Sequence, residues 1–163
     1  MQKILLTGVN GQVGHALKTK LTEYEVIALS REQLDLTKIH DIRRVVREIK
    51  PNVIINPAAY TAVDKAESEP ELAFAINTAA VQILAEEAAR LGAALIHFST
   101  DYVYDGTKKN PYVEHDDVNP VSVYGKSKLA GEAAIRAVGL PQILTGLSSS
   151  CSTYGFFLVP SYT

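Results

Sequence analysis

Short apolar runs alternate along the chain with longer stretches in which apolar residues recur every three or four positions. The apolar runs predict buried strands, at 3–7, 25–30, 52–56, 93–99 and 142–147. The periodic stretches predict helices, at 11–23, 38–50, 70–91 and 122–138. Apolar strands that alternate with helices are typical of a parallel sheet covered on both faces. We therefore expect an α/β fold with a doubly wound sheet, with no internal repeat and no linker.

Particular residues mark the expected ends of these helices. Thr37 is expected to cap the helix over 38–50, and Ser122 is expected to cap the helix over 122–138. Gly92 is expected to close the helix over 70–91. The apolar face of the second helix is expected to consist of Ile39, Ile42, Val45, Val46 and Ile49.

Length and composition restrict the class of protein. A chain of 163 residues with 47% hydrophobic and 21% charged residues fits one globular domain with a sizeable core. The formal charge of −2 gives no basic field for nucleic acid or a membrane surface, and no segment predicts a signal peptide or a membrane span. One cysteine excludes an intrachain disulfide framework and a cysteine-rich zinc site. We expect a cytoplasmic location.

A glycine-rich turn, GVNGQVG, follows the first predicted strand. Its glycines at 8, 11 and 14 allow a tight turn, and the helix that follows presents free N–H groups to a phosphate. The alternative is a turn that serves only helix–strand packing. At the first strand–helix junction of an alternating chain, the pattern favours dinucleotide binding by a Rossmann-type fold. The residues concerned are Gly8, Asn10, Gly11, Gln12, Val13 and Gly14.

The next two strands end in further candidate cofactor residues. Arg31 could contact a 2′-phosphate, which favours NADP, or it could be a solvated arginine. Asp35 and Leu36 could contact adenine, although Asp35 also suits a turn or helix entry. After the third strand, the small residues Ala58 and Ala59 would let a cofactor lie flat, or they could serve packing alone.

The pattern Tyr-x-x-x-Lys occurs twice, as Tyr104 with Lys108 and as Tyr124 with Lys128. The first pair encloses Asp105-Gly106, which predicts a turn. The second pair lies in a predicted helix, where positions four apart share a face. A nearby ammonium lowers the pKa of a tyrosine from about 10, which would allow proton exchange with a carbonyl or alcohol. The alternative is an ordinary surface pair.

Hydroxyl groups at the end of the fourth strand favour the second pair. Ser99 and Thr100 lie at the carboxyl edge, where open α/β sheets bind ligands, and a hydroxyl there can bond the same substrate oxygen. We therefore identify Tyr124 and Lys128 as the candidate catalytic pair. His97 lies inside a strand pattern and is expected to be a core residue, and the sequence contains no metal-ligand cluster.

Four motifs together resemble the extended short-chain dehydrogenase/reductases, and among them the dTDP-4-dehydrorhamnose reductase family. The motifs are TGVNGQVG, NPAAYTAVDKAE, FSTDYVYDG and PVSVYGKSKLAGE. The resemblance implies NADPH, or alternatively NADH, as the cofactor, and reduction of the 4-keto group of dTDP-4-dehydro-L-rhamnose to give dTDP-L-rhamnose. It implies catalytic roles for Thr100, Tyr124 and Lys128, with Lys128 also holding the cofactor ribose.

The resemblance also assigns binding residues around this set. Tyr60, Ser99, Tyr124 and Lys128 join the cofactor residues named above, and Thr61, Val63 and Tyr102 are expected to face the sugar nucleotide. The chain departs from the family near its end, because residues 137–163 carry no charge and the chain contains no tryptophan.

We expect a cofactor domain over 1–144 and an atypical tail over 145–163, with the substrate domain largely missing. A frameshifted or truncated gene product would explain the tail, as would a buried strand followed by an interface segment. The expected activity is reductase, impaired by truncation, and the alternative is a regulatory or vestigial dinucleotide-binding module. Exposed apolar residues in the tail predict self-association, with a homodimer as one form.

Overall fold

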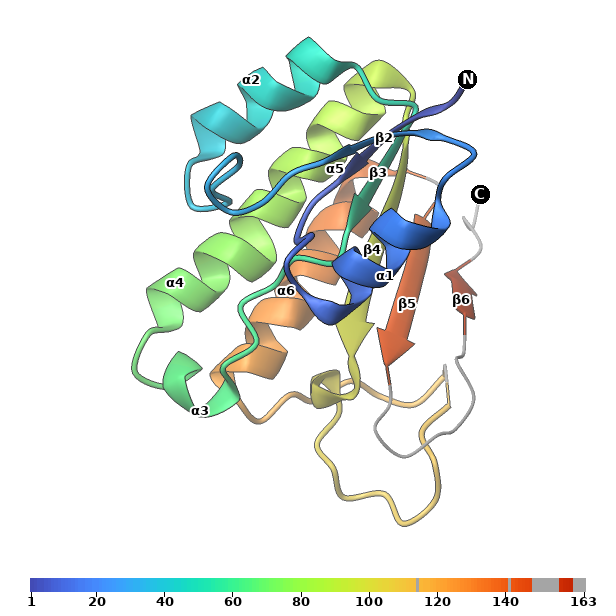
Figure 1. The fold of residues 1–163 in the computed structure, drawn as a ribbon. Helices are drawn as coiled ribbons and strands as arrows, with labels where there is room; N and C mark the ends of the chain where they lie inside the picture. The colour runs from blue at the N-terminus through green and yellow to red at the C-terminus, as the bar shows by residue number, and fades with distance from the viewer. Residues whose placement is uncertain (114, 141, 148–155, 160–163) are drawn as a thin grey trace.

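The strands form the parallel sheet that the strand and helix pattern predicts. The computed structural model describes residues 1–113, 115–140, 142–147 and 156–159. In these residues the chain forms a six-stranded sheet in the order β2-β1-β3-β4-β5-β6 (Figure 1). β1 to β5 run parallel, and β6 pairs antiparallel with β5. The strands are β1 (Lys3–Leu6), β2 (Glu25–Ala28), β3 (Val53–Asn56), β4 (Ala94–Thr100), β5 (Gln142–Leu147) and β6 (Phe156–Val159).

Helices cover both faces of the sheet, with α1 on one side and α2, α5 and α6 on the other (Figure 1). The α-helices are α1 (Gln12–Lys20), α2 (Ile39–Ile49), α3 (Val63–Ala66), α4 (Pro70–Phe74), α5 (Ala80–Leu91) and α6 (Val123–Val138). A π-helical turn, η1 (Ala75–Ala79), joins α4 to α5, and a 3₁₀ turn, η2 (Asp101–Val103), follows β4. None of the helices in the described part of the chain is long and apolar enough to cross a membrane.

The core follows from the alternation of side chains along each strand. Leu5, Ile54 and Leu95 lie side by side on β1, β3 and β4 and pack in the cluster formed with α2, α5 and α6. Their neighbours Ile4 and Leu6 point to the opposite face and pack against α1. Each fully buried side chain of this kind stabilises the fold by about 1.5–3 kcal/mol relative to exposure. The expected doubly wound sheet is therefore confirmed.

The predicted helix ends are confirmed at two of three places. Gly92 ends α5 with φ 66°, a left-handed conformation that glycine adopts freely. Ser122 caps α6, because its hydroxyl accepts a 3.0 Å hydrogen bond from the Gly125 N–H. The prediction for Thr37 was wrong. Lys38 occupies the cap position of α2, and the Thr37 hydroxyl instead donates to Asp35 Oδ1 at 2.8 Å.

The single helix predicted over 70–91 is interrupted. α4 begins at Pro70 as expected, but the π-helical turn over Ala75–Ala79 adds a residue to the helical path before α5 begins. The sequence of the predicted tail has neither a helical nor a strand period. Within it, the apolar run FFLV forms strand β6. β5 crosses the expected boundary at residue 145 and pairs with β4 along its whole length.

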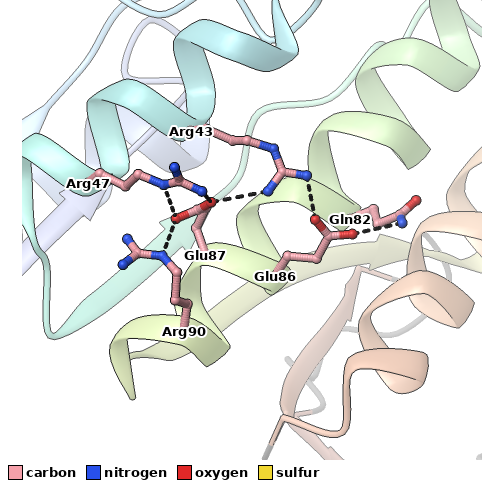
Figure 2. Close-up of polar contacts among 6 residues, drawn as sticks. All are labelled: Arg43, Arg47, Gln82, Glu86, Glu87 and Arg90. Carbon is pink, nitrogen blue, oxygen red and sulfur yellow. Dashed lines mark hydrogen bonds and ion pairs between the residues drawn. The ribbon is translucent and has the colours of Figure 1, made fainter.

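A buried carboxylate joins α2 to α5. Glu87 on α5 is 1% exposed and accepts hydrogen bonds from Arg47 at 2.6 and 2.9 Å, from Arg90 at 2.8 Å and from Arg43 at 3.1 Å (Figure 2). Arg43 also reaches Glu86 at 2.6 Å. These bonds, with that from Arg47 first, lower the pKa of Glu87 to about 2 against the opposing effect of burial. The carboxylate therefore stays charged and holds the two helices together.

Candidate active site at the carboxyl edge of the sheet

The segments that follow β1 and β3 meet at one edge of the sheet. The strand order reverses beside β1, because β2 lies on one side of it and β3 on the other. Such a reversal opens a crevice at the carboxyl ends of the strands. Gly8 follows β1 with φ 59°, and a Cβ there would lie 2.9 Å from the backbone N and Cα of Ala58. Only glycine permits this contact, so two predicted cofactor residues adjoin.

The glycine turn presents the start of α1 to the same crevice. Gly11 is the N-cap of α1 and provides no capping side chain, and the first turn of α1 contains no acidic residue. Gly14 packs directly on the turn, because a Cβ there would lie 2.2 Å from the Gly8 carbonyl oxygen. Asn10 and Gln12 are exposed, and Val13 is half-buried. The free N–H groups and the dipole of α1 suit a pyrophosphate.

The predicted adenosine residues after β2 differ from one another in their surroundings. Arg31 is exposed. Asp35 forms the turn left open by the sequence, since its Oδ1 accepts from the Thr37 N–H at 3.0 Å and the Thr37 hydroxyl at 2.8 Å. These bonds lower the pKa of Asp35. Leu36 is 7% exposed and belongs to the core. Their contacts with a cofactor stay predictions.

The loop after β3 is fixed by the side chain of Asn77, in the π-helical turn. Asn77 Oδ1 accepts from the Tyr60 N–H at 2.8 Å, and its Nδ2 donates to the Tyr60 carbonyl at 3.0 Å. The same Nδ2 lies 3.0 Å from Ser127 Oγ on α6. Thr61, which follows, is exposed. One amide thus ties the predicted cofactor loop to the helix of the candidate catalytic pair.

Tyr124 and Lys128 lie one turn apart on α6 and are 8% and 2% exposed. The ring of Tyr124 meets the ring of Tyr102 edge to face, with centroids 5.4 Å apart. Val63 packs in the apolar cluster around Tyr124. A hydrogen bond links Tyr124 to Thr100, whose Oγ1 also lies 3.3 Å from the Tyr102 N–H. The predicted catalytic set and two predicted substrate residues are therefore neighbours.

The expected effect of Lys128 on the pKa of Tyr124 was wrong. Burial raises the pKa of the Tyr124 phenol, and the hydrogen bond from Thr100 only partly opposes it. Lys128 Nζ is directed elsewhere, to the Phe98 carbonyl at 2.5 Å and to His97 Nε2 at 3.2 Å. The phenol therefore stays protonated at neutral pH and suits a proton donor. Burial also lowers the pKa of Lys128 to about 8.

The first tyrosine–lysine pair lies outside this arrangement, as predicted. Tyr104 stacks on Tyr112 with ring centroids 4.2 Å apart. Lys108 forms an ion pair with Asp116 at 2.5 Å. Neither residue lies in a helix. Both side chains approach Tyr112, since Lys108 Nζ lies 5.8 Å from the centroid of its ring, so this pair packs within the loop.

Two further predictions concern β4. His97 is 1% exposed and belongs to the core as expected. Ser99 was expected to offer its hydroxyl to a substrate or cofactor, but that hydroxyl donates to Glu132 Oε1 on α6. Glu132 also accepts from Arg136 at 2.8 Å. Thr100 thus remains the hydroxyl residue beside Tyr124.

Sequence reasoning missed two residues that hold this edge together. Asn77 is the one asparagine within the alanine-rich helical stretch, and a buried polar side chain on an apolar face signals a specific partner. Glu132 lies one turn after Lys128, a spacing that places both on one face of α6. Gly131, directly before Glu132 in the sequence, lets α6 approach η1, since a Cβ there would lie 2.2 Å from the Asn77 carbonyl oxygen.

Known proteins share these sequences and this fold. The family model described as RmlD substrate binding domain matches residues 1–145. The dTDP-4-dehydrorhamnose reductase of Sinorhizobium fredii is 46% identical over 154 residues, which cover 94% of this chain and 52% of that protein.

Two solved structures are similarly close. The dTDP-4-dehydrorhamnose reductase of Bacillus anthracis, in complex with NADP, is 37% identical with a TM-score of 0.86, over 90% of this chain and 53% of that one. The Clostridium acetobutylicum reductase is 43% identical with a TM-score of 0.85, over 88% and 52%. The chain thus spans about half the length of the relatives it matches.

Proposed function

Because the chain belongs to the RmlD substrate binding domain family, we propose that it is an NADPH-dependent reductase of the 4-keto group of dTDP-4-dehydro-L-rhamnose. The product would be dTDP-L-rhamnose, a nucleotide sugar for cell-surface polysaccharides. The family resemblance and the motif order support membership of the extended short-chain dehydrogenase/reductases. The single observation that carries the proposal is the burial of Tyr124 and Lys128 beside Thr100, at the edge that also bears the glycine turn.

The glycine turn fits the cofactor's pyrophosphate. A Cβ on Gly11 would meet only the Gly8 carbonyl oxygen, at 3.3 Å, so the space in front of this residue is open for a ligand. The N–H groups of α1 would hold the phosphates, and Arg31 would meet a 2′-phosphate. NADPH would supply the hydride for the carbonyl carbon, and NADH is the alternative donor.

The chain's own residues would manage the proton and the orientation. Tyr124, kept protonated by burial, would donate its proton to the keto oxygen as that oxygen gains charge. Thr100 would hydrogen-bond the same oxygen and fix its position. Lys128 would hold the cofactor ribose, while Thr61, Val63 and Tyr102 would face the sugar nucleotide. One residue thus provides the proton and the others fix the geometry.

A second candidate is a dinucleotide-binding module without significant turnover. The observation that favours it is the glycine turn at the start of α1, because this turn would bind a dinucleotide whether or not turnover follows. We propose a cytoplasmic location, which fits a chain with a single cysteine. We also propose that the protein forms a homodimer. The cofactor domain is proposed to extend from residue 1 to about 144.

The test combines a fluorescence titration with NADPH and a turnover assay with dTDP-4-dehydrorhamnose. Gly11→Val should abolish measurable binding while retaining the fold, because Gly11 has φ −82° and ψ 166°, which valine also adopts. Gly11→Ala should give an intermediate loss. Equal affinities of parent and Gly11→Val would reject the turn as the phosphate site. Binding without turnover would favour the second candidate.

A further inference from the structure

Lys128 has a buried ammonium group with two acceptors of different kinds, a backbone carbonyl and an imidazole nitrogen. Its Nζ donates to the Phe98 carbonyl at 2.5 Å and lies 3.2 Å from His97 Nε2. An ammonium has three N–H groups, so these two acceptors leave one for a ligand. The stem of a lysine is flexible, and a single acceptor would leave the head group free to swing. The second acceptor, His97, therefore fixes the direction of the remaining N–H.

His97 is itself held from the opposite side of its ring. Its Nδ1 lies 3.2 Å from the Asn56 carbonyl and 3.2 Å from Asn56 Nδ2. Thr7 Oγ1 in turn donates to Asn56 Oδ1 at 2.5 Å. Since an ammonium can only donate, Nε2 must accept and Nδ1 must carry the proton, which it gives to the Asn56 backbone carbonyl. Asn56 Nδ2 is itself a donor, so in this tautomer it lies beside Nδ1 without a hydrogen bond. Neighbouring strands thus orient one imidazole toward Lys128.

The imidazole of His97 can accept a hydrogen bond at Nε2 because it stays neutral. His97 is 1% exposed, and burial, followed by the charge of Lys128, holds its pKa well below the ordinary value. Glu132 on α6 is a charged group near Lys128, and its carboxylate favours the ammonium. That carboxylate is already engaged by Ser99 and Arg136. His97 is therefore a neutral side-chain acceptor that faces Lys128 from β4, next to the backbone carbonyl of Phe98.

We propose that His97 is a positioning residue, which holds Lys128 Nζ so that its third N–H faces the ligand at the carboxyl edge of the sheet. The ligand's identity rests on the proposed function, but the hold on Lys128 does not. A side chain at position 97 that reaches Nζ with an acceptor should preserve the arrangement. One that falls short of Nζ should release it.

The test measures the pKa of Lys128 in the full chain without substrate. The pH titration follows the lysine ¹³Cε shift, assigned by its loss in Lys128→Met. His97→Gln places an amide oxygen near the former Nε2, whereas His97→Asn reaches only the former Nδ1, and His97→Leu has no acceptor. We expect His97→Asn and His97→Leu to lower the Lys128 pKa by about one to two units, the effect of one charge-assisted hydrogen bond. His97→Gln should restore the parent value.

Thr7→Val is the matched control, because it removes the buried hydrogen bond to the Asn56 side chain but leaves the Asn56 backbone carbonyl, which accepts from His97 Nδ1, in place. It should lower the unfolding temperature and leave the Lys128 pKa unchanged. NADPH affinity should fall about tenfold in His97→Asn and stay near the parent in His97→Gln. An unchanged Lys128 pKa in a folded His97→Asn or His97→Leu protein, or an equal fall in His97→Gln, would overturn the proposal. Failure of the parent to bind NADPH would instead reject the proposed function and leave the pKa comparison valid.

Discussion

Glu87 on α5 and Lys128 on α6 are both almost fully buried ionisable side chains, but their partners differ in charge. Three guanidinium groups surround Glu87, and they lower its pKa to about 2. A backbone carbonyl and a neutral imidazole accept from Lys128, and burial lowers its pKa to about 8. The first arrangement stabilises its charge strongly, and the second only partly offsets the cost of burying it.

The difference separates a structural cluster, around Glu87, from the proposed functional cluster, around Lys128 and Tyr124. Glu87 has its hydrogen-bonding capacity used by α2 and α5, so its charge contributes to the fold. Lys128 retains one N–H donor, and burial destabilises its charge. A ligand that accepts from this N–H would stabilise the charge, as is common at functional sites. We therefore expect substitutions in the cluster of Tyr124 and Lys128 to lower turnover, and substitutions of Glu87 to lower the free energy of unfolding.

The largest expected effect is at the functional cluster. Tyr124→Phe removes the proposed proton donor and keeps the ring against Tyr102. We expect a loss of ~10²–10⁴ in turnover with NADPH affinity nearly intact. Tyr104→Phe is the matched control, and its effect should be much smaller because Tyr104 packs on Tyr112 in the loop. Equal losses from the two changes would contradict the assignment of the pair.

A smaller effect is expected at the structural cluster. Glu87→Gln removes the charge between Arg43, Arg47 and Arg90, and we expect a loss of about 1.5–3 kcal/mol in the free energy of unfolding. Denaturant unfolding measures it, and NADPH affinity should not change. The control is Glu48→Gln, since Glu48 makes an exposed ion pair with Arg44 at 3.4 Å and should contribute close to nothing. A large effect at Glu48 would contradict this reading.

The two clusters should act on opposite limbs of the stability–pH curve. The folded pKa of Glu87 is about 2 and its ordinary value 4.5, so its contribution is complete above about pH 4.5 and is lost as pH falls toward 2. The folded pKa of Lys128 is about 8 and its ordinary value 10.5, so stability rises as pH increases from 8 to 10.5.

Each slope is at most about 1.4 kcal/mol per pH unit. Glu87→Gln should flatten the acid limb alone, and Lys128→Met should flatten the alkaline limb alone. Unfolding free energies of the parent and both variants across this range measure the slopes. Flattening of both limbs by one substitution would show that the clusters are coupled.

The smallest expected effect concerns how the two helices begin. α6 has a side-chain cap at Ser122, two residues before Tyr124, whereas α5 continues directly from η1. Ser122→Ala should lower stability by about 1 kcal/mol and increase amide exchange in the first turn of α6. Exchange in α5 should not change. Unchanged exchange at Gly125 in the variant would contradict the role of this cap.

The fold was largely predictable because its signals are local or periodic. The apolar runs and the helical periodicity depend on residues close in sequence, and they predicted β1 to β5 and four helices. The cap at Thr37 was wrong because Asp35, two residues away, competes for its hydroxyl. The break at η1 was missed because it depends on Tyr60 and Ser127, which only the tertiary structure brings to Asn77.

The candidate site shows the same limit. Spacing identified Tyr124 and Lys128 and placed them on one face of a helix. Spacing could not show that Lys128 turns toward His97, because His97 comes from β4. It could not show that burial raises the pKa of Tyr124, because the side chains around this tyrosine come from α3, α4, η2 and the loop after β3. The commitment of Ser99 to Glu132 likewise requires the packing of α6 on β4.

The π-helical turn also bears on how this segment can change during evolution. The turn adds one residue between α4 and α5, so side chains before and after it do not form one continuous stripe. Deleting one residue from the turn would restore the α-helical path, because a π-helical turn is an α-helix with one extra residue. The extra residue places Asn77 where its amide reaches both Tyr60 and Ser127. A single-residue deletion should therefore keep the helix but break the link between the loop after β3 and α6.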